Sequence, residues 1–319
     1  MLKLLDGRLL LIWGDFYSAN SGDFGPAQIS AITSSDNGRT FAGKYTLQPY
    51  IGKVNVLDVS LLRLRSGKIL FFFLRINSPA DSVPMLRIST DDAKTFSPPK
   101  MIPVTPNPSY AIMNNDRAIQ LKSGRILLPV QYTSDWRVAP RVVTQVYYSD
   151  DDGETWKPSR TIVDVKQKSG AQESGVIELK DSRVLLWGRT SGGHPYRCYS
   201  ADHGETWSTP SAMNVDSPVS PQSIKRIPST GDLLMVWNNS PKDRFPLATA
   251  ISKDEGNTWE HVKNVDDDAA HTYAYTSITF FDKQVILTYY AGPPATDRGS
   301  DASYYSLKLK IVPVGWLYH

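Results

Sequence analysis

The sequence predicts an all-β fold, a six-bladed β-propeller, and two repeated elements carry that prediction. One is a motif of the form S-x-D-x-G-x-T-W/F, and the other is a polar turn that leads into an apolar run. A period of roughly fifty residues indicates repeated supersecondary units. The motif aspartates follow that period, lying 51 to 60 residues apart: Asp36, Asp91, Asp151, Asp202 and Asp254.

The motif itself is suited to a tight turn. Its Asp can accept hydrogen bonds from nearby backbone N–H groups, and the Gly two residues later tolerates a positive φ. The closing Trp or Phe offers a large apolar group to fill the space between strands. One copy departs from the pattern, because Ala93 stands where the others have Gly. We therefore expect these turns to be structural, and to lie at the rim, away from any site.

Short strands flank the turns in every unit. The polar turns precede six apolar runs: Leu9–Trp13, Ile69–Leu74, Ile126–Val130, Val184–Trp187, Leu233–Trp237 and Val285–Tyr290. An innermost strand is expected before most of these turns, at Val59–Leu64, Ala118–Leu121, Gly175–Leu179, Ser223–Ile227 and Ser277–Phe281. Further strands enter the Asp-containing turns, for example at Pro26–Thr33, Val142–Tyr148 and Leu247–Ile251. Six four-stranded units that close radially form a propeller with few exposed edges.

The domain prediction is a single propeller over residues 1–319, because no linker or shift in composition divides the chain. The two ends differ from the repeat. The first unit has only Met1–Leu5 before its turn, so its first blade is expected to be shortened. The last unit ends in Ser303–Val312 without a sixth copy of the motif.

Bulk properties exclude several classes of protein. The chain has 35 basic and 32 acidic residues and no basic run, so no nucleic-acid partner is indicated. No stretch is apolar enough for a membrane span. No metal-ligand spacing, phosphate loop or dinucleotide motif appears, so no cofactor is expected. Cys198, the single cysteine, is interpreted as a small buried residue. The oligomeric state stays open.

The location of the protein also stays open. Met1–Asp6 lacks the apolar region and cleavage site of a signal peptide. A secreted or periplasmic location is expected if a segment precedes this chain, and a cytoplasmic one otherwise.

Polar residues gather just before the predicted innermost strands, where a propeller places its pocket. They include Asn55 and Asp58, Asn114–Arg117, Gln172–Glu173, Ser217–Gln222 and His271–Tyr275. Ionisable groups at these positions are what a site needs.

Across its whole length the chain resembles the sialidase (neuraminidase) superfamily. The repeated motif is similar to that superfamily's Asp box, which also occurs in other proteins. Gln172–Gly175 with Arg189 resembles the segment that carries the buried glutamate and a substrate-binding arginine. Asn238–Pro241 with Arg244 resembles the loop of a second such arginine, and Tyr273–Ser277 resembles the segment of the catalytic tyrosine. Asp23 lies where the family's acid/base aspartate loop is found.

The resemblance implies an exo-α-sialidase, a retaining glycoside hydrolase acting on sialylated glycans. It implies Tyr275 as nucleophile, activated by Glu173, with Asp23 as acid and base. A neutral tyrosine avoids the repulsion that a carboxylate nucleophile would exert on an anionic sugar. Arg189 and Arg244 would bind the carboxylate. We expect Glu173 and Tyr275 to come within hydrogen-bond reach, and the two arginines to converge near Tyr275.

Three further residues are candidate pocket residues: Asp58, Asp116 and Arg117. Asp116 and Arg117 have an alternative interpretation as part of a structural ion pair between units. The family also has a third carboxylate-binding arginine before its first strand, and no such segment is present here. Either it lies upstream, or Arg117 supplies the contact, or two arginines suffice.

Two other functions stay open at this point. One is a glycan-binding propeller without turnover, and the other is a hydrolase or lyase acting on another acidic sugar, such as a uronate.

Overall fold

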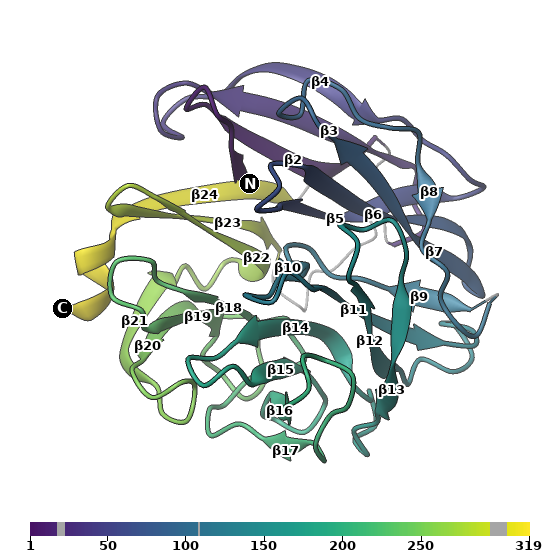
Figure 1. Cartoon of the computed structure of the whole chain (residues 1–319). Helices are drawn as coiled ribbons and strands as arrows, with labels where there is room; N and C mark the ends of the chain where they lie inside the picture. The colour runs from purple at the N-terminus through teal and green to yellow at the C-terminus, as the bar shows by residue number, and fades with distance from the viewer. Residues whose placement is uncertain (18–22, 108, 294–304) are drawn as a thin grey trace.

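Antiparallel sheets surround a central axis in this computed structural model, which describes residues 1–17, 23–107, 109–293 and 305–319. Figure 1 shows the sheets arranged in a ring, each running from the centre of the molecule outward. The first blade consists of β1 (Leu2–Lys3), β2 (Leu9–Phe16), β3 (Ala27–Ser34) and β4 (Ala42–Gln48). The fold is a six-bladed β-propeller, as the repeats predict.

The second and third blades run together as one nine-stranded sheet. A parallel bridge between Ser82 and Tyr110 joins them. The second blade comprises β5 (Asn55–Arg63), β6 (Ile69–Ser78), β7 (Asp81–Ser89) and β8 (Lys100–Met101). The third comprises β9 (Tyr110–Ile112), β10 (Ile119–Gln120), β11 (Ile126–Thr133), β12 (Val143–Ser149) and β13 (Lys157–Val163).

The remaining blades follow in chain order. The fourth comprises β14 (Gln172–Glu178), β15 (Val184–Arg189), β16 (Tyr196–Ser200) and β17 (Ser211–Ala212). The fifth comprises β18 (Ser223–Arg226), β19 (Leu233–Asn238), β20 (Leu247–Ser252) and β21 (Glu260–Asp266). The sixth comprises β22 (Thr272–Phe281), β23 (Gln284–Gly292) and β24 (Ser306–Pro313), followed by the 3₁₀ helix η3 (Val314–Tyr318). The strand expected from Ser303 thus begins outside the described residues. Within the described ranges no helix is long and apolar enough to cross a membrane.

The five motif turns join the last two strands of each of the first five blades. In the copy at β12, Asp151 Oδ1 accepts hydrogen bonds from Ser149 Oγ and Thr155 N, both at 2.8 Å, and Oδ2 accepts one from Thr155 Oγ1 at 2.6 Å. These bonds, the Thr155 hydroxyl first, lower the pKa of Asp151 to about 2. No motif residue lines either cavity described below, within the part of the chain that the structure covers. The prediction that the motif is structural is confirmed.

The copy with alanine keeps the same geometry. Ala93 adopts φ 65°, the left-handed conformation that Gly153 adopts at φ 89° in the copy at β12. Its N–H donates to Ser89 Oγ at 2.9 Å, as the glycine N–H does in the other turns. Alanine is strained in this conformation, so the turn's hydrogen bonds hold it there.

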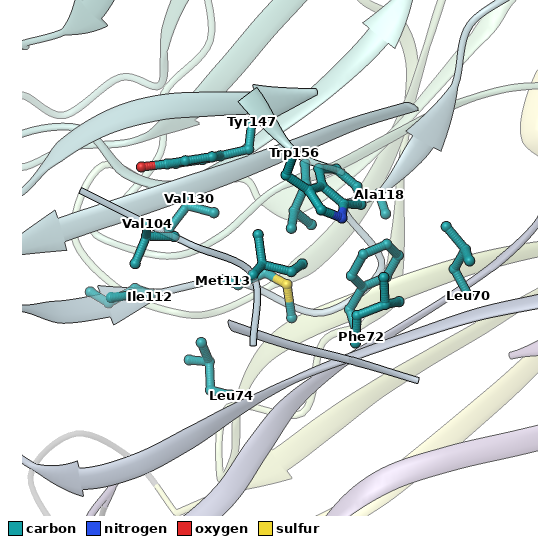
Figure 2. Close-up of a cluster of buried hydrophobic side chains, with 14 of the residues drawn as sticks. Leu70, Phe72, Leu74, Val104, Ile112, Met113, Ala118, Val130, Tyr147 and Trp156 are labelled. Atoms are coloured by element: carbon teal, nitrogen blue, oxygen red, sulfur yellow. The ribbon is translucent and has the colours of Figure 1, made fainter. Parts of the chain in front are cut away.

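The motif tryptophan packs between blades. Figure 2 shows Trp156, from the turn after β12, beside Phe72 of β6. Their rings meet edge to face, with centroids 5.8 Å apart. Met113 and Ala118, on either side of the turn that precedes β10, lie in the same buried cluster. The turn that closes one blade therefore also fixes that blade to its neighbour.

Candidate active site

Backbone bulges in three inner strands carry the candidate side chains. Glu173 in β14 has φ 47°, Tyr275 in β22 has φ 55° and Asp58 in β5 has φ 55°. The strand register shifts at each of these positions, between Gln172 and Gly175, between Ala274 and Ser277, and between Leu57 and Ser60. Left-handed non-glycine residues cost on the order of 1–3 kcal/mol each and concentrate at functional sites.

This arrangement corrects a detail of the sequence prediction. The polar residues are expected before the inner strands, but Asp58, Glu173 and Tyr275 lie within them. Each bulge interrupts the alternation of buried and exposed side chains. The sequence pattern of a strand is therefore recognisable only after the bulge, although the strand itself begins before it. Asp116 also has a positive φ, 58°, and lies in the turn between β9 and β10.

A cavity of about 980 Å³ lies at the centre of the propeller. It brings together seven of the eight sequence-predicted site residues, namely Asp23, Asp58, Asp116, Glu173, Arg189, Arg244 and Tyr275. Arg117, the eighth, is not among its lining residues and instead lines a smaller cavity of about 180 Å³.

Glu173 and Tyr275 form the central pair. Tyr275 Oη donates a hydrogen bond to Glu173 Oε1 at 3.2 Å, so the predicted approach of these side chains is confirmed. Burial, and then the nearby charge of Glu173, raises the pKa of Tyr275 well above its usual value of 10. The hydroxyl is therefore neutral at neutral pH, and its proton points at a carboxylate.

Two arginines flank this pair and converge on one backbone oxygen. Arg189 Nη1 and Arg244 Nη2 each donate to the carbonyl of Val219 at 3.1 Å, which confirms the predicted convergence. Arg189 also holds Glu173, with Nη2 donating to Oε1 at 3.0 Å and Nε lying 2.9 Å from Oε2. Arg244 Nη1 donates to Tyr290 Oη at 2.6 Å, and its guanidinium carbon lies 5.8 Å from the centre of the Tyr275 ring. Since each guanidinium has five N–H donors, both retain donors for a ligand.

The Val219 carbonyl is a functional group that sequence reasoning does not find. The loop that carries it is fixed by Ser220 Oγ, which donates to Asn238 Oδ1 at 2.5 Å, and by Gln222 Nε2, which donates to Ser217 Oγ at 2.9 Å. The polar character of this segment is evident from the sequence, but a backbone oxygen leaves no residue-type signal there.

Asp23 reaches the cavity from the loop before β3, and Asn55 holds that loop. Asn55 Nδ2 donates to the carbonyls of Asp23 and Gly25 at 2.8 and 2.7 Å. The side chain of Asp23 is exposed at the mouth of the cavity. Protein nevertheless surrounds it enough that burial, followed by the charge of Glu173, raises its pKa above 3.8.

The pKa of Asp58 is raised well above 3.8, by burial first and then by the charges of Glu173 and Asp23. The raised pKa values of Asp23 and Asp58 thus favour their protonated acids, which can donate a proton. No set of three or more His, Cys, Asp and Glu side chains suited to a metal ion occurs in the described parts of the chain.

Asp116 forms the floor of the site. Its carboxylate pairs with Lys225 Nζ at 2.6 Å and accepts a hydrogen bond from Ser277 Oγ at 2.8 Å. Asp116 thus forms an ion pair between blades, as the alternative interpretation expects, but its partner is Lys225 of the fifth blade and Arg117 takes no part in that pair. It lines the central cavity as well.

Aromatic side chains that the sequence does not single out also line the cavity. Two of them, Tyr110 and Trp136, stack with ring centroids 5.7 Å apart, and Phe24, which is not a lining residue, packs 6.0 Å from Tyr110. Trp13 and Phe16 of β2 line the same cavity. These residues are distant in sequence and share no motif, so only the fold brings them together.

Comparisons with known proteins agree with this picture. The model of the BNR repeat-like domain matches residues 58–285. A sialidase from Bacteroides fragilis (strain YCH46) is 26% identical over 241 residues, 72% of this chain and 42% of that protein. A sialidase from Paraclostridium sordellii is 28% identical over 231 residues, 65% of this chain and 55% of that protein. The chain therefore spans about half the length of the curated relatives it matches.

Solved structures show the same fold. A protein of unknown function from Dyadobacter fermentans DSM 18053 superposes with a TM-score of 0.77 at 19% identity, covering 98% of this chain and 93% of that one. A leech intramolecular trans-sialidase complexed with 2,7-anhydro-Neu5Ac superposes with a TM-score of 0.79 at 15% identity, covering 99% and 67%.

Proposed function

This chain belongs to the BNR repeat-like domain family, and from that premise we propose that it is an exo-α-sialidase. It releases terminal sialic acid from a glycan with retention of configuration. The observation that carries the proposal is the hydrogen bond of 3.2 Å from Tyr275 Oη to Glu173 Oε1, inside the cavity that Asp23 and both arginines also line.

In the first step Tyr275 Oη attacks the anomeric carbon of the sugar as its proton passes to Glu173. The bond from that carbon to the leaving oxygen breaks, and Asp23 donates its proton to that oxygen. The raised pKa of Asp23 suits this role, because the acid stays protonated at a higher pH than an exposed aspartic acid would.

In the second step the roles of the two carboxyl groups reverse. Asp23 removes a proton from a water molecule, which attacks the same carbon, and the bond to Tyr275 Oη breaks. Glu173 returns its proton to the tyrosine. Two inversions give net retention, and the free enzyme is restored with no proton gained or lost.

The arginines explain why the substrate is an acidic sugar. Arg189 and Arg244 have donors left after their contacts with the protein, and a planar guanidinium binds a carboxylate bidentately. We assign Asp58 to a contact with a polar substituent of the sugar. Asp116 contributes by fixing the floor, since Lys225 and Ser277 already occupy its carboxylate.

Hydrolysis of a fluorogenic α-sialoside tests the proposal, with product anomers followed by NMR. We expect turnover that yields the α-anomer first, and its loss in Tyr275→Phe. Binding of the sialoside without turnover would favour a glycan-binding propeller instead. Turnover of an aryl uronate but not of the sialoside would assign the site to another acidic sugar.

A further inference from the structure

A second cavity, distinct from the candidate active site, lies against the inner strands of the fourth and fifth blades. Its volume is about 180 Å³. Ile177 of β14, Trp187 of β15 and Ile224 of β18 give it largely apolar walls. Four charged residues also line it: Asp116, Arg117, Lys225 and Arg226.

Three of these four charges are neutralised by partners. Asp116 and Lys225 pair with each other at 2.6 Å. Arg226 binds Glu255 through both terminal nitrogens, at 2.8 and 2.7 Å. Arg117 alone has no carboxylate within 4.0 Å, counting the residues that the structure describes. One cation in the lining of the cavity, Arg117, therefore has no ion-pair partner among the described residues, although the charges of Glu173 and Asp116 act on it from farther away.

Arg117 is also poor in hydrogen bonds. Only 3% of the residue is exposed, and its Nε has no partner. Its Nη1 lies 3.4 Å from Ser223 Oγ, a long contact. That oxygen already accepts a bond from Thr276 Oγ1 at 2.8 Å and donates one to Thr276 O at 2.7 Å. Burial lowers the pKa of Arg117 to about 10, so it is still a cation at neutral pH.

Leaving a buried cation without an ion-pair partner is unfavourable, because the charge has lost its hydration. A counter-charge within the cavity removes that penalty. We propose that the cavity binds a monoatomic halide, with chloride as the natural ion, against the guanidinium of Arg117. The bound ion supplies the ion-pair partner that no described residue gives to Arg117.

The walls favour a halide over an oxyanion. Phosphate and sulfate need several donors arranged around their oxygens. Here the other two cationic side chains are engaged with carboxylates. Ile177 and Ile224 have no polar side-chain atom, and Trp187 Nε1 already donates to Gln222 O at 3.2 Å. A halide is a single charged atom and needs fewer hydrogen-bond donors than an oxyanion, and the rest of the cavity has room for water around it.

Thermal unfolding in sodium chloride, sodium bromide and sodium gluconate at equal ionic strength tests this site. A ligand that binds only the folded chain raises Tm with its concentration. We expect Tm to be higher by a few degrees in either halide than in gluconate. The halide effect should vanish in Arg117→Met and persist in part in Arg117→Lys. An equal halide effect in the wild type and in Arg117→Met would overturn the proposal.

Crystals of the wild-type protein grown in bromide give an answer that does not depend on how the variants fold. We expect an anomalous peak in the cavity within hydrogen-bond distance of the Arg117 guanidinium. A well-ordered cavity with no such peak, or a peak from phosphate in crystals grown with phosphate and bromide together, would contradict the halide site.

Discussion

The outer turns and the inner bulges are both repeated around the propeller, and both carry acidic residues in or beside left-handed backbone. In the outer turn at β12, Asp151 has its carboxylate filled by hydrogen bonds, which lower its pKa to about 2. At the inner bulges, burial raises the pKa of Asp58, and Glu173 faces the hydroxyl of Tyr275. The aspartate carboxyl group is thus stabilised as an anion in Asp151 at the rim and destabilised as one in Asp58 at the centre.

This difference between the outer turns and the inner bulges assigns stability to the turns and the proposed chemistry to the bulges. The outer turns are alike because each makes the same local hydrogen bonds, including that from the Ser hydroxyl to the Asp carboxylate. The inner bulges share a backbone conformation but present different side chains: Asp58, Glu173 and Tyr275. A repeated backbone device can therefore aim different reactive groups into one cavity.

Replacing the inner carboxylate should have the largest effect. In Glu173→Gln the amide can still accept the bond from Tyr275 but cannot take its proton, so kcat on a fluorogenic sialoside should fall by about 10²–10⁴. The matched control is Glu178→Gln, at the far end of β14, where Glu178 accepts a bond from Lys122 N. That variant should keep its activity. A loss of less than tenfold in Glu173→Gln would remove the glutamate from the mechanism.

Arg244→Lys should act mainly on binding. A lysine cannot reproduce the forked contacts with Tyr290, Val219 and a carboxylate, so KM should rise about tenfold or more while kcat changes less. Arg197→Lys is the control, since Arg197 Nη1 donates to Gly256 O in a neighbouring outer turn. Steady-state kinetics separate the two effects, and an unchanged KM in Arg244→Lys would argue against carboxylate binding.

At the rim, Ser149→Ala should cost stability and spare activity. The buried hydroxyl accepts from Gly153 N at 2.9 Å, so its removal leaves that N–H without a partner, at a cost of about 1–3 kcal/mol. Urea unfolding gives the free energy, with exposed Ser123→Ala as the reference. A parallel loss of kcat/KM in folded Ser149→Ala would show that rim and centre are coupled.

The smallest expected effect is a change in Tm when an aspartate is replaced by asparagine, and its sign should differ between the inner bulges and the outer turns. The folded pKa of Asp58 is raised, so the stability that its proton contributes is present below pH 3.8 and is lost as pH rises through the folded pKa. Asp58→Asn, which also tolerates a positive φ, should therefore raise Tm by a few degrees at pH 7 and not at pH 3.5.

Asp36→Asn is the matched control at the rim. Bonds from Thr40 lower the pKa of Asp36 to about 2, so its stabilising contribution is present above pH 3.8 and is lost as pH falls through 2. That variant should lower Tm at pH 7. Melting curves over this pH range measure both, and shifts of the same sign would refute the electrostatic contrast.

The sequence predicted the fold because the outer turns are local. Asp151, Gly153 and Thr155 lie within one short segment, so their spacing can be recognised directly in the order of residues along the chain. It also brought Glu173 and Tyr275 into one hypothesis, through segments that resemble a known family. The repeat period assigned the two residues to different blades. Because the blades of a propeller meet at its centre, we could predict that the two side chains approach each other.

The features that could not be predicted from the sequence depend on backbone geometry and on the direction in which side chains point. The bulges that place Asp58 within β5 break the alternation by which strands are recognised. The role of the Val219 carbonyl depends on a backbone atom, which leaves no signal in residue type. Arg117 directly follows Asp116 in the chain, yet it lines only the smaller cavity while Asp116 lines both. Asp116 lies in a turn and has a positive φ, so the order of residues along the chain does not tell which way each side chain points.

The most direct test of the central claim is to trap the covalent intermediate. A fluorinated sialosyl fluoride should react with the wild-type protein and slow the release step enough for mass spectrometry of peptides. We predict one sialyl adduct per chain, on the peptide that contains Tyr275, and none in Tyr275→Phe. An adduct on another residue, or turnover of sialosides with no adduct at Tyr275, would contradict the account.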